Sequence, residues 1–204
     1  MKKEYLIFDM DGTLVHSMNS SMEVIYDYIK KIDSELLDKS RYVFENTMGT
    51  PLIRQIETIF EGDYNHQKIT DEIYEELLHL ETEFFPGVIE KIKELSANYT
   101  LFLTTGNSTP TAMKHLEEGG IKDNFAIILG SDKLLKGRDH IEEFIRYSCD
   151  DDFCQKAVYT GDGEGDKLFS GQFDIDFIRI GKFGKDKYEI NSVAEIDEIL
   201  EILN

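Results

Sequence analysis

Proline, cysteine and basic side chains are all scarce in this 204-residue sequence. With three prolines and no repeat or Pro/Gly-rich tract, no linker divides the chain, and its length indicates one domain or one domain with a sizeable insertion. The two cysteines, Cys149 and Cys154, fit neither a disulfide framework nor a zinc pattern, so we expect reduced thiols in a cytoplasmic protein. Lys and Arg total 22 against 41 Asp and Glu, for a formal net charge of −19. Binding a phosphate backbone requires clustered basic side chains, so the composition excludes a general nucleic-acid binder.

Long apolar runs are also missing. No run approaches the ~20 residues that a transmembrane helix requires, so no membrane partner is expected. Asp9 and Asp11 interrupt the apolar stretch near the N-terminus, which argues against a signal peptide. What the sequence does have is a hydrophobic content of 41%, ample for a buried core at this length.

Five short apolar runs are spaced along the chain. They are Tyr5–Phe8, Tyr99–Thr105, Phe125–Leu129, Ala157–Thr160 and Asp176–Ile180. The first ends in acids and the other four end at a glycine, a pattern typical of buried strands in a parallel sheet. Helical periodicities lie between them, for example over Val88–Leu95 and from Ser108 to Gly120. This alternation predicts an α/β fold with right-handed crossovers.

One interval lacks the strand pattern. From Ser17 to Phe84 only helical stretches are found, such as Met22–Ile32 and Ile69–Glu83. Roughly 70 residues is far more than a crossover between two parallel strands needs. We therefore expect a helical subdomain inserted after the first strand, with an internal turn at Thr47–Pro51.

Acids and hydroxyls gather where the predicted strands end. Asp9 and Asp11 follow the first strand, Thr105 closes the second, and Asp162 and Asp166 follow the fourth. Ligands of open α/β sheets bind at the carboxyl ends of the strands, so these side chains should converge. Carboxylates brought close together repel unless a cation joins them, and oxygen ligands suit Mg²⁺. An Asp-x-Asp-Gly-Thr turn alone would be an ordinary strand-to-loop turn, but its combination with the other strand ends indicates a site.

These motifs resemble those of a known family. Asp9–Val15 (DMDGTLV) resembles motif I of the haloacid dehalogenase (HAD) superfamily, Leu103–Asn107 resembles its motif II, and Gly161–Asp166 resembles its motif IV. Phe85–Val88 resembles the return from an inserted cap. The resemblance implies a Rossmann-like, HAD-like core at 1–16 and 85–204, with a helical cap at 17–84 of the phosphoglycolate phosphatase and β-phosphoglucomutase type.

The resemblance also implies a reaction. Asp9 would attack phosphorus and form a phosphoaspartate, while Asp11 would protonate the leaving oxygen and later deprotonate water. Dehalogenase members lack an acid at the position of Asp11, so phosphoryl transfer is favoured over cleavage of a carbon–halogen bond. The expected enzyme is a Mg²⁺-dependent phosphatase, a phosphoric monoester hydrolase acting on a small phosphorylated metabolite.

Ligand roles follow from the same resemblance. Mg²⁺ would be held by the Asp9 carboxylate, the Asp11 backbone carbonyl and Asp162, with Asp166 as a further ligand or anchor. Thr105 would act in catalysis by holding phosphoryl oxygens together with the backbone amides after Asp11. The predicted substrate-binding residues are Gly12, Thr13, Gly106, Asn107 and Arg54.

Some assignments stay open at this stage. The family requires a cation before the helix after the third strand, and the sequence offers Lys136, which its spacing favours, then Arg138 and Lys133. His16 stands where the family often has an acid and is a surface or hinge residue or a substrate contact. Arg54 or Arg41 would reach the distal group of the substrate, or simply lie on a solvated helix face.

Two other functions are compatible with the motifs. A sugar-phosphate mutase of the β-phosphoglucomutase type would use the same aspartate pair and return the phosphoryl group to its substrate. A non-catalytic, receiver-like module also gathers acids, a hydroxyl and a lysine around Mg²⁺, but the helical insertion counts against it. The protein is expected to be a monomer or a dimer.

Overall fold

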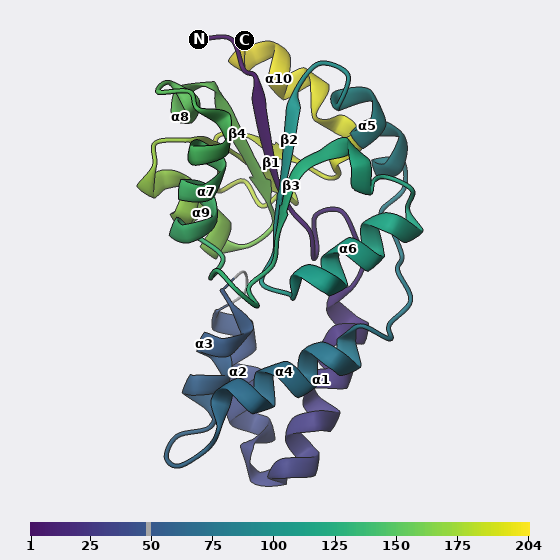
Figure 1. Ribbon diagram of the computed structural model, residues 1–204, viewed down its shortest axis with the longest axis vertical. Coiled ribbons are helices and arrows are strands. Elements are labelled where there is room, and N and C mark those ends of the chain that lie inside the picture. The colour runs from purple at the N-terminus through teal and green to yellow at the C-terminus, as the bar shows by residue number, and fades with distance from the viewer. Residues whose placement is uncertain (48–49) are drawn as a thin grey trace.

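A six-stranded, wholly parallel sheet forms the core of the protein, whose computed structural model describes residues 1–47 and 50–204. The strands are β1 (Tyr5–Asp9), β2 (Thr100–Thr104), β3 (Phe125–Leu129), β4 (Ala157–Gly161), β5 (Asp176–Ile180) and β6 (Glu189–Ile190). Their order is β3-β2-β1-β4-β5-β6 (Figure 1). The chain therefore proceeds in opposite directions across the sheet on the two sides of β1, which makes the end of β1 the switch point of the topology.

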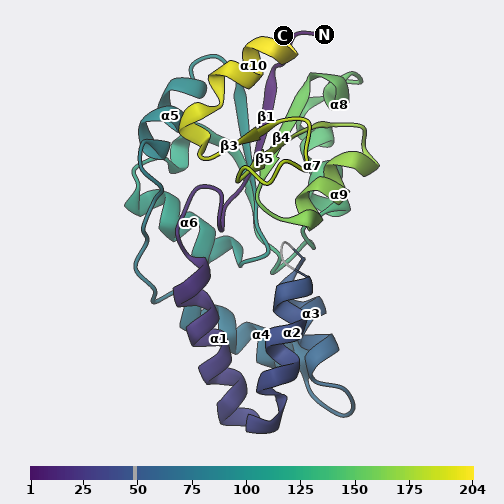
Figure 2. The same cartoon turned by 180° about the vertical axis from the view of Figure 1, so that it is seen from behind.

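Helices cover both faces of the sheet. One face carries α5 (Val88–Leu95), α6 (Thr109–Glu118) and α10 (Asp197–Leu203), and the other carries α7 (Arg138–Ser148), α8 (Phe153–Lys156) and α9 (Glu164–Gln172) (Figures 1 and 2). Successive strand residues point to opposite faces, so Leu6 and Phe8 pack under the first layer and Ile7 packs under the second. The predicted α/β fold is confirmed.

The ends of α6 show how the local sequence sets these elements. Ser108 precedes the helix and its hydroxyl accepts a hydrogen bond from the amide of Thr111 at 3.2 Å. Pro110 lies in the first turn, where its missing amide hydrogen costs nothing. Gly120, just beyond the last turn, has a φ of 62°, which suits glycine.

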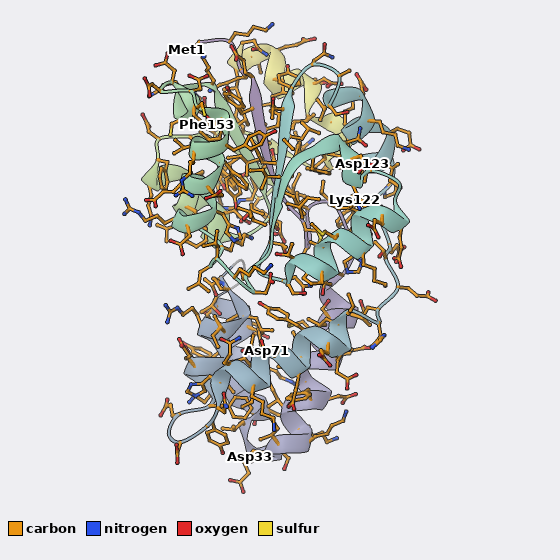
Figure 3. The ribbon with its side chains drawn as sticks, viewed as in Figure 1. Met1, Asp33, Asp71, Lys122, Asp123 and Phe153 are labelled. Atoms are coloured by element: carbon orange, nitrogen blue, oxygen red, sulfur yellow. The ribbon has the colours of Figure 1, made fainter. Side chains whose placement is uncertain are left out.

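A second group of helices lies beyond the carboxyl ends of the strands. It consists of α1 (Met18–Ile32), α2 (Leu37–Asn46), α3 (Leu52–Ile59) and α4 (His66–Leu77), with a short 3₁₀ turn at Ser34–Leu36. Their apolar side chains form a hydrophobic cluster that shares no residue with the two clusters of the sheet. Figure 3 shows Asp33 at the far tip of this group and Met1 at the opposite end of the molecule. The exact division at residues 16/17 and 84/85 stays a prediction.

Two adjacent segments connect the helical group to the sheet. Val15 and Phe84 form an antiparallel bridge, and the amide of His16 donates to the carbonyl oxygen of Glu83 at 2.6 Å. The ring of His16 lies 3.6 Å from that of Phe85, centroid to centroid. The chain thus leaves the core and returns to it side by side.

The structure differs from the sequence prediction in the insertion and near the C-terminus. The helix predicted over Ile69–Glu83 begins earlier and ends at Leu77, because the chain must turn back toward the sheet. There the hydroxyl of Thr82 contacts the buried ring of His115 on α6. Strand β6 was not predicted, since two residues are too few to show a pattern. Met48 and Gly49 of the predicted Thr47–Pro51 turn lie outside the described residues.

Cys149 and Cys154 both carry free thiols. Of the helices in the described ranges, none has the length and apolar character needed to cross a bilayer.

Candidate active site

The carboxyl ends of β1, β2 and β4 meet at a cavity of about 110 Å³ that faces the helical group. Its floor includes Asp9 from β1, Asp11 from the following turn, and Asp162 from the loop after β4. In-register pairing of β1 with β2 and β4 brings these residues together although they are far apart in the chain. The convergence expected from the sequence is thus present in the structure.

Asp9 is the most enclosed acid on this cavity. It is 3% exposed, and its Oδ1 lies 2.7 Å from the amine of Lys136. The hydroxyl of Thr13 contacts its other oxygen at 3.4 Å. Burial raises the pKa of Asp9 well above its ordinary value, Lys136 opposes this effect, and Asp166 and Asp162 add to it. An anionic Asp9 therefore depends on positive charge nearby.

Lys136 supplies part of that charge. Its amine bridges Asp9 and Asp166, at 2.7 and 2.8 Å, and its backbone amide donates to the hydroxyl of Ser131 at 3.1 Å. Burial by itself lowers the pKa of Lys136, but Asp166 and Asp9 outweigh it and leave this pKa well above its ordinary value. The side chain is consequently a fixed ammonium group in the floor of the cavity.

The other two cations that the sequence left open point elsewhere. Arg138 is exposed and its Nε donates to Glu142 at 2.7 Å. Lys133 is exposed in the same loop. Of the three, Lys136 is the one that reaches Asp9.

Asp11 lies on the cavity wall with both carboxylate oxygens held by hydroxyls. Thr105 donates to Oδ2 at 2.8 Å, and Ser17, just before α1, donates to Oδ1. The Thr105 hydroxyl in turn accepts a hydrogen bond from the amide of Asn107 at 3.0 Å. Thr105 therefore orients Asp11 in this structure and does not line the cavity, so the predicted contact of Thr105 with phosphoryl oxygens stays a prediction.

Asp9, Asp162 and Asp166 form a cluster suited to a metal ion. One carboxylate oxygen from each lies within 4.8 Å of the others. Asp166 is fully buried, accepting from Tyr159 at 2.9 Å and from the amide of Gly163 at 3.0 Å. Three carboxylates and one ammonium leave two negative charges, which a single divalent cation balances. An all-oxygen donor set of this charge fits Mg²⁺.

Asp162 is the acid of this cluster without a cationic partner among residues 1–47 and 50–204. Burial, Asp166 and Asp11 raise its pKa to about 6 against the opposing effect of Lys136. Its carboxylate packs on Gly12, where a Cβ atom would lie 2.3 Å from Oδ2. Gly12 also has a φ of 79°, so the turn after β1 requires glycine for two reasons.

The predicted substrate-binding residues divide into two groups. Gly106 and Asn107 line the cavity, and among the described residues no acceptor contacts the Nδ2 donor of Asn107. Gly12 and Thr13 lie beneath the acids and do not line it. Arg54 also does not line it: its side chain is 60% exposed and pairs with Glu57.

Two other residues considered from the sequence lie away from the cavity. Arg41 is exposed, and its guanidinium lies over the ring of Tyr26. His16 is exposed at the paired connection to the helical group and does not line the cavity, so its role as a surface or hinge residue stays a prediction.

Several residues of the site were not found by sequence reasoning. Ser17 and Tyr159 hold Asp11 and Asp166, and Gln55 and Tyr74 bring polar atoms from the helical group to the cavity. Tyr159 lies in a strand beside the motif, but its contact depends on which face of the sheet it occupies. For Gln55 a signal existed, because it shares a helix face with the apolar residues of α3.

Known proteins are similar to this chain in sequence. The model of the family described as "Haloacid dehalogenase-like hydrolase" matches residues 6–180. A curated relative, "Probable phosphatase IndB" of Dickeya dadantii (strain 3937), is 26% identical over 149 residues, which are 69% of this chain. The chain spans 64% of the length of that relative.

Solved structures share the fold. "A predicted phosphatase from Clostridium acetobutylicum" is 20% identical with a TM-score of 0.77, covering 98% of this chain and 100% of that one. The HAD-hydrolase YfnB of Bacillus subtilis, solved bound to magnesium, is 16% identical with a TM-score of 0.67, and both chains are covered completely. These likenesses extend over the helical group as well as the sheet.

Proposed function

Because the chain belongs to the haloacid dehalogenase-like hydrolase family, we propose that it is a phosphatase that hydrolyses small phosphate monoesters through a phosphoaspartate. The observation that carries the proposal is the contact of Asp9 with Lys136 at the switch point of the sheet, beside Asp11 on the same cavity. A carboxylate held by a buried ammonium, with a second acid within the same small space, is the arrangement that two-step phosphoryl transfer needs.

In the first step Asp9 is the nucleophile. One of its carboxylate oxygens forms a bond to phosphorus, and the bond between phosphorus and the ester oxygen breaks. Asp11 gives its proton to that departing oxygen, so an alcohol leaves. Thr105 and Ser17 hold the Asp11 carboxylate in place for this transfer.

In the second step water completes the hydrolysis. Asp11, now ionised, takes a proton from a water molecule whose oxygen attacks phosphorus, and the acyl phosphate bond to Asp9 breaks. Inorganic phosphate leaves and Asp9 is regenerated. Lys136 neutralises negative charge on Asp9 in both steps, and the Asn107 amide donates to phosphoryl oxygens.

Mg²⁺ fits the acidic cluster and would be held by Asp9, Asp162 and Asp166, with the Asp11 backbone carbonyl as a further ligand. The ion supplies charge neutralisation, which lets the dianionic phosphoryl group approach three carboxylates. Its presence in the related YfnB structure supports this choice of metal. Without such a cation, the negative charge of the acidic cluster would oppose the approach of an anionic ester to this cavity.

We further propose that residues 17–84 act as a cap on a core of residues 1–16 and 85–204. The helical group carries its own hydrophobic cluster and supplies one wall of the cavity. When such a cap closes, it excludes bulk water and strengthens every charge interaction in the site.

Release of inorganic phosphate from a panel of small esters, measured with and without Mg²⁺, tests the proposal. We expect turnover many times the enzyme concentration, dependent on Mg²⁺, and a loss of at least about 10³-fold in Asp9→Asn. Asp123→Asn, which changes an exposed acid far from the cavity (labelled in Figure 3), is the matched control and should retain full activity. An Asp9→Asn protein with most of the wild-type rate would exclude this nucleophile.

A further inference from the structure

The described cap residues that line the cavity are mostly apolar and none of them is charged, and from this wall we infer the substrate class. We propose that the substrate is the phosphate monoester of a short, uncharged alcohol that carries one further hydroxyl group. The inference rests on the proposed phosphatase activity and identifies what leaves when the ester is cleaved.

Apolar side chains dominate the cap side of the cavity. They are Met22, Ile25, Phe44, Leu52 and Leu77, contributed by all four cap helices. The leaving group lies against this wall when its phosphoryl group lies on Asp9, because the acids form the opposite side. Carbon atoms of the leaving group would be desolvated there at a gain of about 25 cal/mol per Å².

Cations are missing from that wall. Lys136 is the one basic residue on the described lining of the cavity, and Asp9 and Asp166 already occupy its amine. Met18, Asn19, Met48 and Gly49, whose side chains lie outside the described part of the cap, are all uncharged residues. A carboxylate or a second phosphate on the leaving group would therefore be buried without a partner of opposite charge, which disfavours such esters.

The two arginines of the cap add no positive charge to this wall. Arg54 is exposed and paired with Glu57, and Arg41 lies over Tyr26. Neither lines the cavity. A distal anionic group of a substrate thus meets neither of these arginines at this wall.

Gln55 of α3 brings an amide group to the cap side of the cavity and presents a hydrogen-bond acceptor there. Gln55 is 8% exposed, and its Nε2 donates to both the carbonyl and the hydroxyl oxygen of Thr47, at 3.1 and 3.0 Å. A carbonyl oxygen only accepts, so this contact fixes which end of the amide is Nε2. In the described ranges, 1–47 and 50–204, no donor reaches Oε1, which leaves it as an acceptor on the cavity wall.

Three cap hydroxyls also line the cavity, those of Ser21, Thr50 and Tyr74. Thr50 donates to the carbonyl oxygen of Thr47 at 2.7 Å, and Ser21 of α1 adds a further hydroxyl to this wall. Tyr74 donates to the carbonyl oxygen of Gly106 at 2.8 Å and so binds the core instead of the ligand. The cavity of about 110 Å³ is also well below the roughly 300 Å³ at which pockets for larger ligands begin. Together these features select a leaving group of a few carbon atoms with one hydroxyl to donate to Gln55.

Four esters of one chain length test the charge argument. They are propyl, 3-hydroxypropyl, 2-carboxyethyl and 3-aminopropyl phosphate, whose leaving groups end in methyl, hydroxyl, carboxylate and ammonium. With Mg²⁺ and the wild-type protein, we expect kcat/KM to be highest for the hydroxypropyl ester. The two charged esters should be slower by at least about 100-fold. Equal or faster hydrolysis of the carboxyethyl ester would overturn the inference.

Substitutions of two neighbouring residues of α3 test whether Gln55 recognises the hydroxyl group of the substrate. In Gln55→Leu, the ratio of kcat/KM for the hydroxypropyl ester over the propyl ester should fall roughly 10-fold, because one hydrogen bond is lost. Arg54→Ala is the matched control, and all four esters should keep their wild-type order. A ratio unchanged in Gln55→Leu, or a selective loss of the carboxyethyl ester in Arg54→Ala, would contradict the assignment.

The outcome also separates this inference from the function on which it rests. Phosphate release that favours charged leaving groups leaves the phosphatase proposal standing and overturns only the substrate class. If neither these esters nor an activated probe, p-nitrophenyl phosphate, released phosphate with Mg²⁺, the proposed function itself would fail and the inference with it.

Discussion

The hydroxyl of Tyr74 on cap helix α4 donates a hydrogen bond of 2.8 Å to the carbonyl oxygen of Gly106, at the end of β2. The bond joins two parts of the protein whose hydrophobic clusters are separate. Burial raises the pKa of Tyr74, so its phenol stays protonated and able to donate. The cap is therefore fastened to the core directly beside the cavity.

We expect Tyr74→Phe to loosen that closure without unfolding the cap. The ring remains in its cluster, so the free energy of unfolding should fall by only about 1 kcal/mol. Closure around the substrate should become less favourable, which raises KM by roughly 3- to 10-fold with a smaller effect on kcat. Steady-state kinetics check this, with Tyr42→Phe, an exposed tyrosine of α2, as the control.

Lys136→Met should damage both catalysis and stability. The variant leaves Asp9 and Asp166 buried without their counter-charge, which costs about 3 kcal/mol in the free energy of unfolding at neutral pH. Turnover should fall by roughly 10²- to 10⁴-fold. Urea unfolding and phosphate release measure the two effects. Lys133→Met, an exposed lysine in the same loop, should behave as wild type, and equal effects of the two substitutions would refute the role of Lys136.

Mg²⁺ should raise the melting temperature of the wild-type protein, because the acidic cluster that we propose as its site is assembled only in the folded chain. Asp162→Asn should abolish most of this rise while melting at a similar or higher temperature without metal, since it removes a buried charge. The control Asp71→Asn, at an exposed acid of α4, should keep the full metal-dependent rise. Thermal unfolding with Mg²⁺ or with a chelator distinguishes these outcomes.

Because the ring of His140 is buried and neutral, we expect the free energy of unfolding to fall at low pH. Its Nε2 donates to the carbonyl oxygen of Leu134 and its Nδ1 accepts from Thr104, so the buried ring is neutral, and burial lowers its pKa to about 4. An unfolded histidine, with a pKa of about 6.5, binds a proton first as the pH falls. The contribution of His140 to the free energy of unfolding, about 3 kcal/mol, is therefore fully present above pH ~6.5 and is lost as the pH falls toward ~4.

The matched comparison is His140→Gln, whose amide keeps one donor and one acceptor. Its free energy of unfolding should depend less on pH between about 7 and about 4.5 than that of the wild type. Urea titrations at several pH values give both slopes, and identical slopes would mean that His140 is not the group responsible.

Gly12→Ala should lower the free energy of unfolding by more than the strain of its backbone conformation alone would. A Cβ at this position would lie 2.3 Å from the Asp162 carboxylate, in addition to the strain of a φ of 79°. Gly62 has a φ of 97°, and a Cβ added there would have no atom within 4 Å, so Gly62→Ala isolates the strain. We expect a loss of about 1 kcal/mol for Gly62→Ala and about 2 to 3 kcal/mol for Gly12→Ala, with activity reduced only in the latter. Urea unfolding and phosphate release of both variants check this.

The parts of the fold that could be predicted are those determined by local pattern. Five buried strands ended by glycine or acid give the sheet, and parallel pairing then brings Asp9, Asp11 and Asp162 together whatever the helices do. The two-residue strand β6 and the early end of α4 depend on distant contacts and left no such pattern.

The cap wall shows what the sequence left open and why. Arg54 was considered as a substrate contact or as a residue of a solvated helix face, and the apolar residues Leu52, Ile56 and Ile59 set the buried face of α3 and leave Arg54 outside it. The same periodicity places Gln55 inside. The phase of this helix could be read from the sequence, and it would have placed Gln55 on the buried face and Arg54 outside it. The orientation of Thr105 toward Asp11, in contrast, depends on packing that no local pattern records.

The antiparallel bridge between Val15 and Phe84 has a topological consequence. Everything between these two residues departs from the sheet and comes back at neighbouring points, so a tight turn joining them would preserve every strand crossover. The two clusters of the sheet would lose no member, because the cap cluster is separate. The sheet and the helical group, to which we assign catalysis and recognition of the leaving group, are thus modular. We expect that either could be exchanged, by evolution or in a chimera, without rethreading the other.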